Sequence, residues 1–313
     1  MDLKQLRALL TVSETGNVTR AAELLNLVQP AVSRQLRLLE EDLGVGLFER
    51  ERHGMALTEA GKTLVAYTRR AMAELDRARA EIGGSSTGVS GLVTLGLLPS
   101  TCDLLASPLM SGLSNAHPGI RLRIAMGFSG TLAQWLESGE VDAALLYGAD
   151  RLPNLQTRPL IEEALWVFGP ASARLRKNRP VTLRSLVGKP LILPSAPHGI
   201  RTLVEHACAV SGVTLQIAAE TNAMSVQRSL SIGGHGLTIL PAIAVFDDVA
   251  RKLATAAPLI EPRITRTIVL ALPTNRAVSR PVRHTVDLLV QCIRSVTSQG
   301  LWPESRWLGG DSS

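Results

Sequence analysis

The chain has 313 residues, of which 45% are hydrophobic, so it is long enough for two or three domains with sizeable cores. The net charge of +6 does not mark the first part of the chain as basic, because residues 1–87 carry 12 basic and 12 acidic side chains. Three widely separated cysteines argue against a disulfide framework and against a CxxC metal site. No stretch reads as a signal peptide or a membrane span, so we expect a cytoplasmic protein without a membrane partner.

The first 44 residues predict three short helices. Residues 2–15 form an amphipathic helix, Asn17 is a typical helix cap, and a turn at residues 26–27 leads into a third helix from Gln29. The inward stripe of that helix consists of Val32, Leu36, Leu39 and Leu43. The opposite face carries the polar side chains of Gln29, Ser33, Arg34 and Arg37, which suit base edges and phosphates in a DNA major groove. An ordinary helix hairpin with a solvated polar face is the alternative.

A β-hairpin is predicted over residues 45–57, where two short apolar runs flank a charged turn ending at Gly54. Placed directly after a recognition helix, such a hairpin is a wing. Its Arg50, Arg52 and His53 would then contact phosphates or the minor groove. The alternative is a charged turn without a partner.

A long helix follows, with Thr58 as its cap and an end near residue 81. Its length of roughly 35 Å is too great to be buried against so small a domain, which favours pairing with a second copy. A dimer would also carry two recognition helices to half-sites about 34 Å apart. The run GGSSTG at residues 83–88 is typical of a flexible linker.

From residue 91 strands and helices alternate, which is typical of an α/β sheet with crossover helices. Expected strands cover 92–98, 120–127, 141–147, 162–169, 190–195, 213–220, 237–241 and 265–272, and expected helices cover 103–116, 132–138, 200–210 and 224–232. Residues 99–101 are expected to form a loop. Two successive α/β units suggest two lobes with a ligand site between them. Residues 301–313 read as a loosely held tail.

Hydroxyl side chains follow several of the expected strands and are candidates for lining the cleft. They are Ser100, Thr101, Ser129 and Ser195, and Arg201 adds a guanidinium suited to a carboxylate. The alternative is that these hydroxyls are only helix caps. Cys102 lies beside them, where a helix N-terminus could lower its pKa, but a packed and inert thiol is the simpler interpretation.

Sequence motifs of enzymes fail in this chain. GFSGT at residues 127–131 lacks the final glycine of a nucleophile elbow, and GHG at 234–236 lacks the third glycine of a dinucleotide site. The six histidines show no metal spacing. We therefore expect a protein that is not an enzyme and that uses no cofactor or metal.

Residues 1–60 closely resemble the N-terminal domain of LysR-type transcriptional regulators. The motifs that carry the resemblance are AAELLN, QPAVSRQ, LEEDLGVGLFER and LTEAG, and later pieces such as HPGIRLRI and GHGLTILP also fit the family. The stretch PLILPSAPHGIRTLVEH looks more like the nitrogen assimilation control branch. The resemblance implies an α plus α/β chain, with an N-terminal winged helix-turn-helix, a long linker helix and a two-lobed α/β effector domain like periplasmic binding proteins.

The resemblance also implies domain bounds and site residues. We expect a DNA-binding domain at 1–58, a dimerisation helix and hinge at 59–87, an effector domain at 88–300 and a tail at 301–313. Lobe 1 would span 88–161 and 265–300, and lobe 2 would span 162–264. The implied DNA contacts are Gln29, Pro30, Ser33 and Arg34 with Arg50 and Arg52 in the wing, and the implied cleft residues are Ser100, Thr101, Ser129, Ser195 and Arg201. Val28 departs from the family, which usually has Ser or Thr as the cap there.

We thus expect a homodimeric or homotetrameric regulator whose partners are double-stranded DNA and a small-molecule effector, for which an organic acid is one candidate. RNA polymerase is a further candidate partner. Two alternatives stay open. One is a cytosolic small-molecule-binding module without a role on DNA, and the other is an enzyme built on the two-lobed fold.

Overall fold

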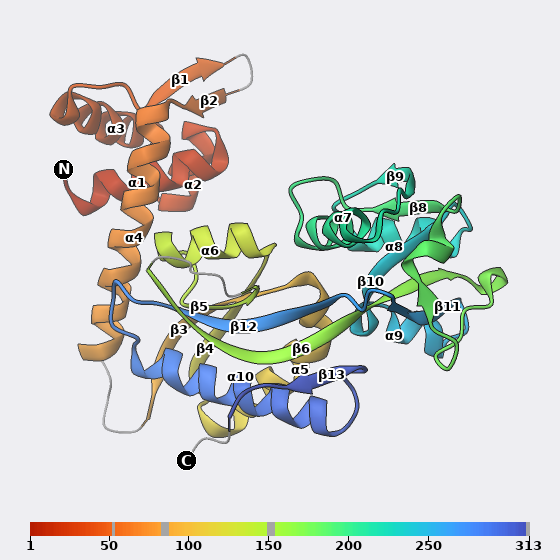
Figure 1. Cartoon of the computed structure of the whole chain (residues 1–313). Coiled ribbons are helices and arrows are strands. Elements are labelled where there is room, and N and C mark those ends of the chain that lie inside the picture. The colour runs from red at the N-terminus through yellow and green to blue at the C-terminus, as the bar shows by residue number, and fades with distance from the viewer. Residues whose placement is uncertain (52–53, 83–87, 149–153, 311–313) are drawn as a thin grey trace. The chain divides into compact units, whose positions relative to one another are not determined.

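The computed structural model describes residues 1–51, 54–82, 88–148 and 154–310 (Figure 1). Its contacts divide the chain into two compact units, one formed by residues 1–83 with 138–140 and the other by the remaining residues. Arg52, His53 and most of the expected linker at 83–88 lie outside the described residues. Within the described part, no helix combines the length and the apolar character needed to cross a membrane.

The first unit contains the predicted helices and hairpin. Its elements are α1 (Leu3–Thr15), α2 (Val18–Leu25), α3 (Gln29–Leu43), β1 (Phe48–Glu51), β2 (Gly54–Leu57) and α4 (Glu59–Ile82). Asp2 and Gln5 form a capping box before α1, and Asn17 caps α2 by accepting from the amides of Thr19 and Arg20. These short-range signals fix where the helices begin.

The helices α1, α2 and α3 and the start of α4 pack around one small core. The buried side chains are Ala8, Leu9, Val12, Ala21, Ala22, Val32, Leu36, Leu39, Leu47 and Val65, with Leu6 beside them. Glu40 ties the hairpin to α3, because its Oε1 accepts from the amide of Leu47 at 2.7 Å and from that of Phe48 at 3.3 Å. The polar face of α3 is thereby left outside, with its orientation fixed by the core.

The second unit is built on a mixed sheet. Its described strands are β3 (Ser90–Leu97), β4 (Gly119–Met126), β5 (Ala143–Tyr147), β6 (Leu155–Pro170), β7 (Val181–Thr182), β8 (Pro190–Leu193), β9 (Gln216–Glu220), β10 (Leu237–Pro241), β11 (Ala254–Ile260), β12 (Thr265–Pro273) and β13 (Ser305–Trp307). The main strand order is β4-β3-β5-β12-β6-β10-β8-β9. We call the part on β3, β4, β5 and β12 lobe 1, and the part on β8 to β11 lobe 2.

Both lobes share the long strand β6, which Figure 1 shows running from one lobe into the other. Residues 155–164 of β6 pair with β12 in lobe 1, whereas residues 165–170 pair with β10 and β11 in lobe 2. Each lobe has its own apolar core, one running from Val93 to Trp302 in sequence and the other from Leu165 to Ile264. The cores are therefore separate although the sheet is continuous.

Helices cover the strands of each lobe (Figure 1). They are α5 (Pro99–Ala116), α6 (Ser129–Ser138), α7 (Gly199–Ser211), α8 (Met224–Ile232), α9 (Ala242–Ala250) and α10 (Arg280–Ser298), with the 3₁₀ turns η1 (Ala171–Ala173) and η2 (Leu183–Leu186). In lobe 1, α5 and α10 pack against each other on one side of the strands, and α6 lies on the other side. The strands β3, β4 and β5 pair in parallel in lobe 1, and β8, β9 and β10 do so in lobe 2. This agrees with the alternating strands and helices of the sequence, which predict parallel strands joined by crossover helices.

Two expectations from sequence are wrong. Residues 99–101 are not a loop, because α5 begins at Pro99, where proline loses no hydrogen bond in the first turn of a helix. Residues 301–310 are not loosely held, because Trp302 is 2% exposed and β13 pairs with β6, and the rest of the expected tail lies outside the described residues. Burial of one tryptophan outweighs the polar and glycine-rich character that favoured a free tail.

Candidate functional site

The N-terminal end of α3 presents a polar surface in the first unit. Gln29, Pro30, Arg34 and Arg37 are exposed and Ser33 is half-buried, while Val32 on the opposite face is fully buried. Gln29 Nε2 donates to Ser33 Oγ at 3.1 Å, so these two side chains hold each other on one face of the helix. The predicted outward residues thus share one surface.

The two arginines on this surface differ in their partners. Arg37 Nε lies 3.3 Å from Glu41 Oε1 one turn further along, and both side chains are largely exposed. Arg34 forms no ion pair or hydrogen bond with any residue that the structure describes. An exposed, unpaired guanidinium near a helix N-terminus is available for phosphate oxygens or a guanine edge.

Exposed apolar side chains lie at the end of α2 and in the turn that leads into α3. Leu24, Leu27 and Val28 are 64%, 48% and 69% exposed. Val28 is the N-cap residue of α3 and supplies no side-chain hydrogen bond to the helix, as its departure from the family pattern predicted. Apolar groups beside polar ones match a DNA groove, where thymine methyl groups lie next to donors and acceptors.

The hairpin beside α3 is a two-stranded wing, in which Arg50 pairs in register with Met55. Gly54 has φ +148°, and a Cβ at this position would overlap the carbonyl oxygen of Gly16. That carbonyl also accepts from the amide of Met55 at 2.8 Å. Glycine is therefore required where the wing meets the end of α1.

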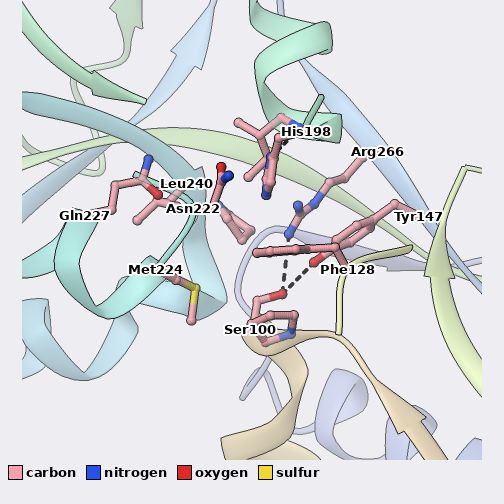
Figure 2. A pocket seen from close by; sticks show the side chains of 12 residues that line it. Ser100, Phe128, Tyr147, His198, Asn222, Met224, Gln227, Leu240 and Arg266 are labelled. Atoms are coloured by element: carbon pink, nitrogen blue, oxygen red, sulfur yellow. Dashed lines mark hydrogen bonds between the residues drawn. The ribbon is translucent and has the colours of Figure 1, made fainter. Parts of the chain in front are cut away.

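In the second unit, a pocket lies between the two lobes (Figure 2). Lobe 1 and its strand β12 contribute Pro99, Ser100, Phe128, Tyr147 and Arg266, and lobe 2 contributes His198, Ile200, Asn222, Met224, Gln227, Leu240 and Pro241. Apart from Arg266, these residues lie at or shortly after the carboxyl ends of strands, where ligands bind in such folds. The cavity holds about 30 Å³, close to the volume of one water molecule.

Three helices begin at this pocket. Ser100, Ile200 and Met224 line it, and they belong to the first turns of α5, α7 and α8. The unpaired amides and dipole of a helix N-terminus favour negative charge. Three such ends therefore meet at one pocket, although the Ile200 amide of α7 already donates to His198 Nδ1.

Arg266 is the only arginine or lysine among the described residues that line the pocket, and its charge is already balanced. Its Nε donates to Glu163 Oε1 at 2.6 Å, and both side chains are almost fully buried. Its guanidinium carbon lies 3.7 Å from the centre of the Tyr147 ring, which places a cation over an aromatic face. Arg266 is thereby held flat against the lobe 1 wall.

Ser100 connects this arginine to the tyrosine. Its Oγ lies 2.6 Å from the hydroxyl of Tyr147 and 3.5 Å from Nη2 of Arg266, the two contacts dashed in Figure 2. Burial raises the pKa of Tyr147 to about 12, more than the charge of Arg266 lowers it. Tyr147 is therefore a neutral hydroxyl at neutral pH.

His198 faces the lobe 1 residues from lobe 2. Its ring lies edge-on to Phe128 with 5.0 Å between the ring centres, a direct contact across the two lobes. Burial lowers the pKa of His198, and the positive charge of Arg266 lowers it further. Its Nδ1 accepts from the amide of Ile200 at 3.2 Å, so the neutral ring caps α7.

Of the cleft residues expected from sequence, Ser100 is the one that lines this pocket. Thr101 is fully buried and its hydroxyl donates to the carbonyl of Leu98. Ser129 Oγ accepts from the amide of Tyr147 at 2.8 Å at the start of α6. Both hydroxyls bond to the backbone, but neither bond is the helix cap that was the alternative interpretation.

Ser195 and Arg201 lie near the pocket without lining it. The amide of Ser195 donates to Asn222 Oδ1 at 3.1 Å, which positions the asparagine that does line it. Arg201 pairs with both Glu205 and Glu220, so its charge is satisfied within lobe 2. A ligand carboxylate at Arg201 would have to compete with two carboxylates already present.

Cys102 is half-buried in the second turn of α5. Burial raises the pKa of its thiol, which is opposite to the lowering that a helix N-terminus could give. Its Sγ makes a weak contact with the carbonyl of Leu98 at 3.5 Å. These features fit the packed thiol considered from sequence.

Sequence reasoning missed Tyr147, Arg266 and Glu163, the residues that shape the lobe 1 wall. Glu163 carried one signal, since it comes directly before the apolar run ALWVFG at residues 164–169. A carboxylate in a strand that is buried on both faces needs a cation close by. The sequence does not show which of the 33 basic residues supplies it.

Two family models match the chain. The model described as "Bacterial regulatory helix-turn-helix protein, lysR family" matches residues 3–62, and the one described as "LysR substrate binding domain" matches residues 86–292. Together they cover both compact units. The α3 surface falls in the first match and the interlobe pocket in the second.

Similar proteins extend over nearly the whole chain. The HTH-type transcriptional regulator BbuR of Bordetella bronchiseptica is 31% identical over 97% of this chain and 93% of its own length. The nitrogen assimilation regulatory protein nac of Klebsiella aerogenes is 26% identical over 96% of both chains. The solved structure of full-length CbnR in complex with its target DNA is similar with a TM-score of 0.69, at 22% identity over 94% of this chain and 99% of that one.

Proposed function

Because the chain belongs to the LysR family of DNA-binding transcriptional regulators with an effector-binding domain, we propose that the exposed end of α3 reads its operator. Gln29, Ser33 and Arg34 would contact base edges and phosphates, with Pro30 and Arg37 beside them. The observation that carries this assignment is the unpaired, exposed Arg34 on a helix whose opposite face is buried. We also propose DNA contacts for Arg50, Arg52 and His53, from their positions in the sequence of the hairpin.

Replacing Arg34 by alanine tests the proposal. Loss of a guanidinium that contacts a guanine costs about 1–3 kcal/mol, so affinity for the operator should fall by about 10- to 100-fold. Fluorescence anisotropy with duplexes from the region upstream of its own gene measures this at fixed salt. Lys4→Ala on the exposed face of α1 is the matched control, because it removes the same charge elsewhere. If Arg34→Ala and wild type bound the operator with equal affinity, the proposal that α3 contacts DNA would be wrong.

We propose that the effector is a small organic anion that binds between the lobes. The three helix N-termini at the pocket favour a negatively charged ligand. Since Glu163 neutralises Arg266, the side chains add no net positive charge, and the pocket suits a ligand of low charge. The cavity is too small for such a molecule, so binding requires the lobes to separate or side chains to move. The ligand can shift this equilibrium only by the difference in its affinity for the two states.

Ser100→Ala distinguishes this function from a ligand-binding module without a role on DNA. The variant should bind the operator as wild type does and should lose the response to organic acids found by thermal-shift screening. If wild type binds ligand but no upstream DNA at any salt concentration, the chain is such a module. If Ser100→Ala keeps an unchanged dose–response, the effector binds elsewhere.

We also propose how the chain is organised and assembled. The functional units are residues 1–58, 59–87 and 88–300, and copies pair through α4 as a homodimer or homotetramer. Tyr67 and Leu75 support this pairing, because they are 62% and 39% exposed on α4 and fall near a heptad spacing with Ala71. The protein would act in the cytoplasm, contact RNA polymerase when bound to DNA, and catalyse no reaction.

A further inference from the structure

A second cavity lies within lobe 2, away from the interlobe pocket. It holds about 410 Å³, within the range of pockets that bind small molecules and far larger than the interlobe cavity. Its walls come from β6, η1, α9 and β11, and Pro303 of the C-terminal segment contributes to its edge. It shares no lining residue with the interlobe pocket.

The walls of this cavity are apolar. Trp166 of β6 lies on one side, and Val245, Phe246 and Val249 of α9 lie on another. Phe246 and Val249 are 45% and 37% exposed, so the cavity opens along α9 and a ligand can reach it. Burying these side chains under an apolar ligand would favour binding, because apolar surface is removed from water.

Inside the cavity, the wall offers little to a polar ligand. The hydroxyl of Thr255 donates to the carbonyl of Pro170 at 3.0 Å and accepts from the amide of Leu175 at 3.2 Å. The indole nitrogen of Trp166 has no hydrogen-bond partner in the described structure, but this atom is buried and is not exposed to the cavity. The part of a ligand that enters the cavity should therefore be apolar.

Charge at the rim is positive. Lys177 Nζ lies 3.6 Å from Glu304 Oε1, so this lysine has a partner. Lys252 is exposed just after α9 and forms no ion pair with any described residue. The ammonium of Lys252, at the mouth of an apolar cavity, suits a ligand that has an apolar body with one negative charge at its end.

We propose that lobe 2 carries a second ligand site that takes an amphipathic monocarboxylate, with its aliphatic or aromatic body against Trp166 and α9 and its carboxylate at Lys252. The site is distinct from the proposed effector pocket and does not depend on it. The lobe 2 cavity is already large enough for a ligand, whereas the interlobe pocket has to open before a ligand can bind.

Binding of octanoate to the full chain, measured by calorimetry, tests the proposal, with octan-1-ol as the uncharged probe. Wild type should bind octanoate saturably. Lys252→Gln should weaken the affinity for octanoate by roughly fivefold, which is the contribution expected of an exposed ion pair. The affinity for octan-1-ol should not change. Lys189→Gln, at an exposed lysine elsewhere in lobe 2, is the matched control and should alter neither probe.

Blocking the cavity gives the second arm. Val249→Trp should abolish binding of both probes, and Ala171→Phe on the opposite rim provides the same block if the first variant melts at a lower temperature than wild type. Asn222→Leu alters the interlobe pocket and should leave octanoate binding intact. Absence of saturable binding, or loss of binding in Asn222→Leu with retention in both blocked variants, overturns the proposal.

Discussion

Trp302 donates its indole N–H to Glu163 Oε2 at 2.9 Å, and this contact joins the C-terminal segment to the wall of the interlobe pocket. The other oxygen of the same carboxylate receives Arg266. One buried carboxylate thus satisfies a tail residue and a pocket residue at once. The orientation of Arg266 over Tyr147 depends on this shared anchor.

Trp302→Phe should lower the free energy of unfolding of the second unit by about 1–3 kcal/mol more than Trp307→Phe does, because it removes a buried hydrogen bond to a charged acceptor. Urea denaturation followed by circular dichroism measures the difference. Trp307→Phe is the control, because it makes the same change from indole to the smaller phenyl ring, while the indole nitrogen of Trp307 is buried without a partner and no hydrogen bond is lost.

Glu163→Gln should be more damaging, by about 3–5 kcal/mol, because it leaves the buried guanidinium of Arg266 without a counter-charge. The neighbouring Glu162→Gln breaks only the exposed pair with Arg306 and should cost less than about 1 kcal/mol. Chemical denaturation of both variants in parallel gives the comparison. Equal losses would mean that Glu163 is not the anchor of Arg266.

Val28→Ser should stabilise the first unit by about 1 kcal/mol, since α3 begins without any side-chain cap and serine accepts well at this position. Thermal denaturation of the full chain, followed by the melting of the first unit, measures the gain. Val45→Ser replaces another exposed valine that is not an N-cap residue and should give no such increase. A loss of stability in Val28→Ser would show that its amides already have another acceptor.

The stability of the second unit should fall as the pH drops below about 6.5. The folded state lowers the pKa of His198, so the unfolded chain takes up the proton first and protonation favours unfolding. His198→Asn keeps a capping oxygen but cannot titrate, and it should flatten the profile between about pH 7 and 5. His206→Asn on the same helix is the control. Urea midpoints at each pH provide the measurement.

The sequence predicted best what depends on neighbours in the chain. The caps at Asn17 and Thr58 and the missing cap at Val28 are local, and the structure has each of them. The inward stripe of α3 is confirmed for Val32, Leu36 and Leu39 but is wrong for Leu43, which is 41% exposed where the helix ends. The strand and helix at residues 237–241 and 224–232 also match, because their apolar periodicity is strong.

The wall of the pocket could not be predicted in the same way. Glu163 and Arg266 are 103 residues apart, and Glu163 and Trp302 are 139 apart. Their pairing follows from strand registers and from a tail that returns to β6, neither of which has a local signal. For the same reason, hydroxyls at Thr101 and Ser129 that looked like cleft residues bond to the backbone instead.

The long strand β6 has a consequence for how the effector domain responds to any ligand. Its backbone passes from the ladder of one lobe to that of the other without a break between Ala164 and Leu165. The lobes therefore cannot move independently along this strand. Any change in their relative orientation requires β6 to bend or twist. We expect a break in the chain at this junction to destabilise both lobes, and not to yield two lobes that fold independently.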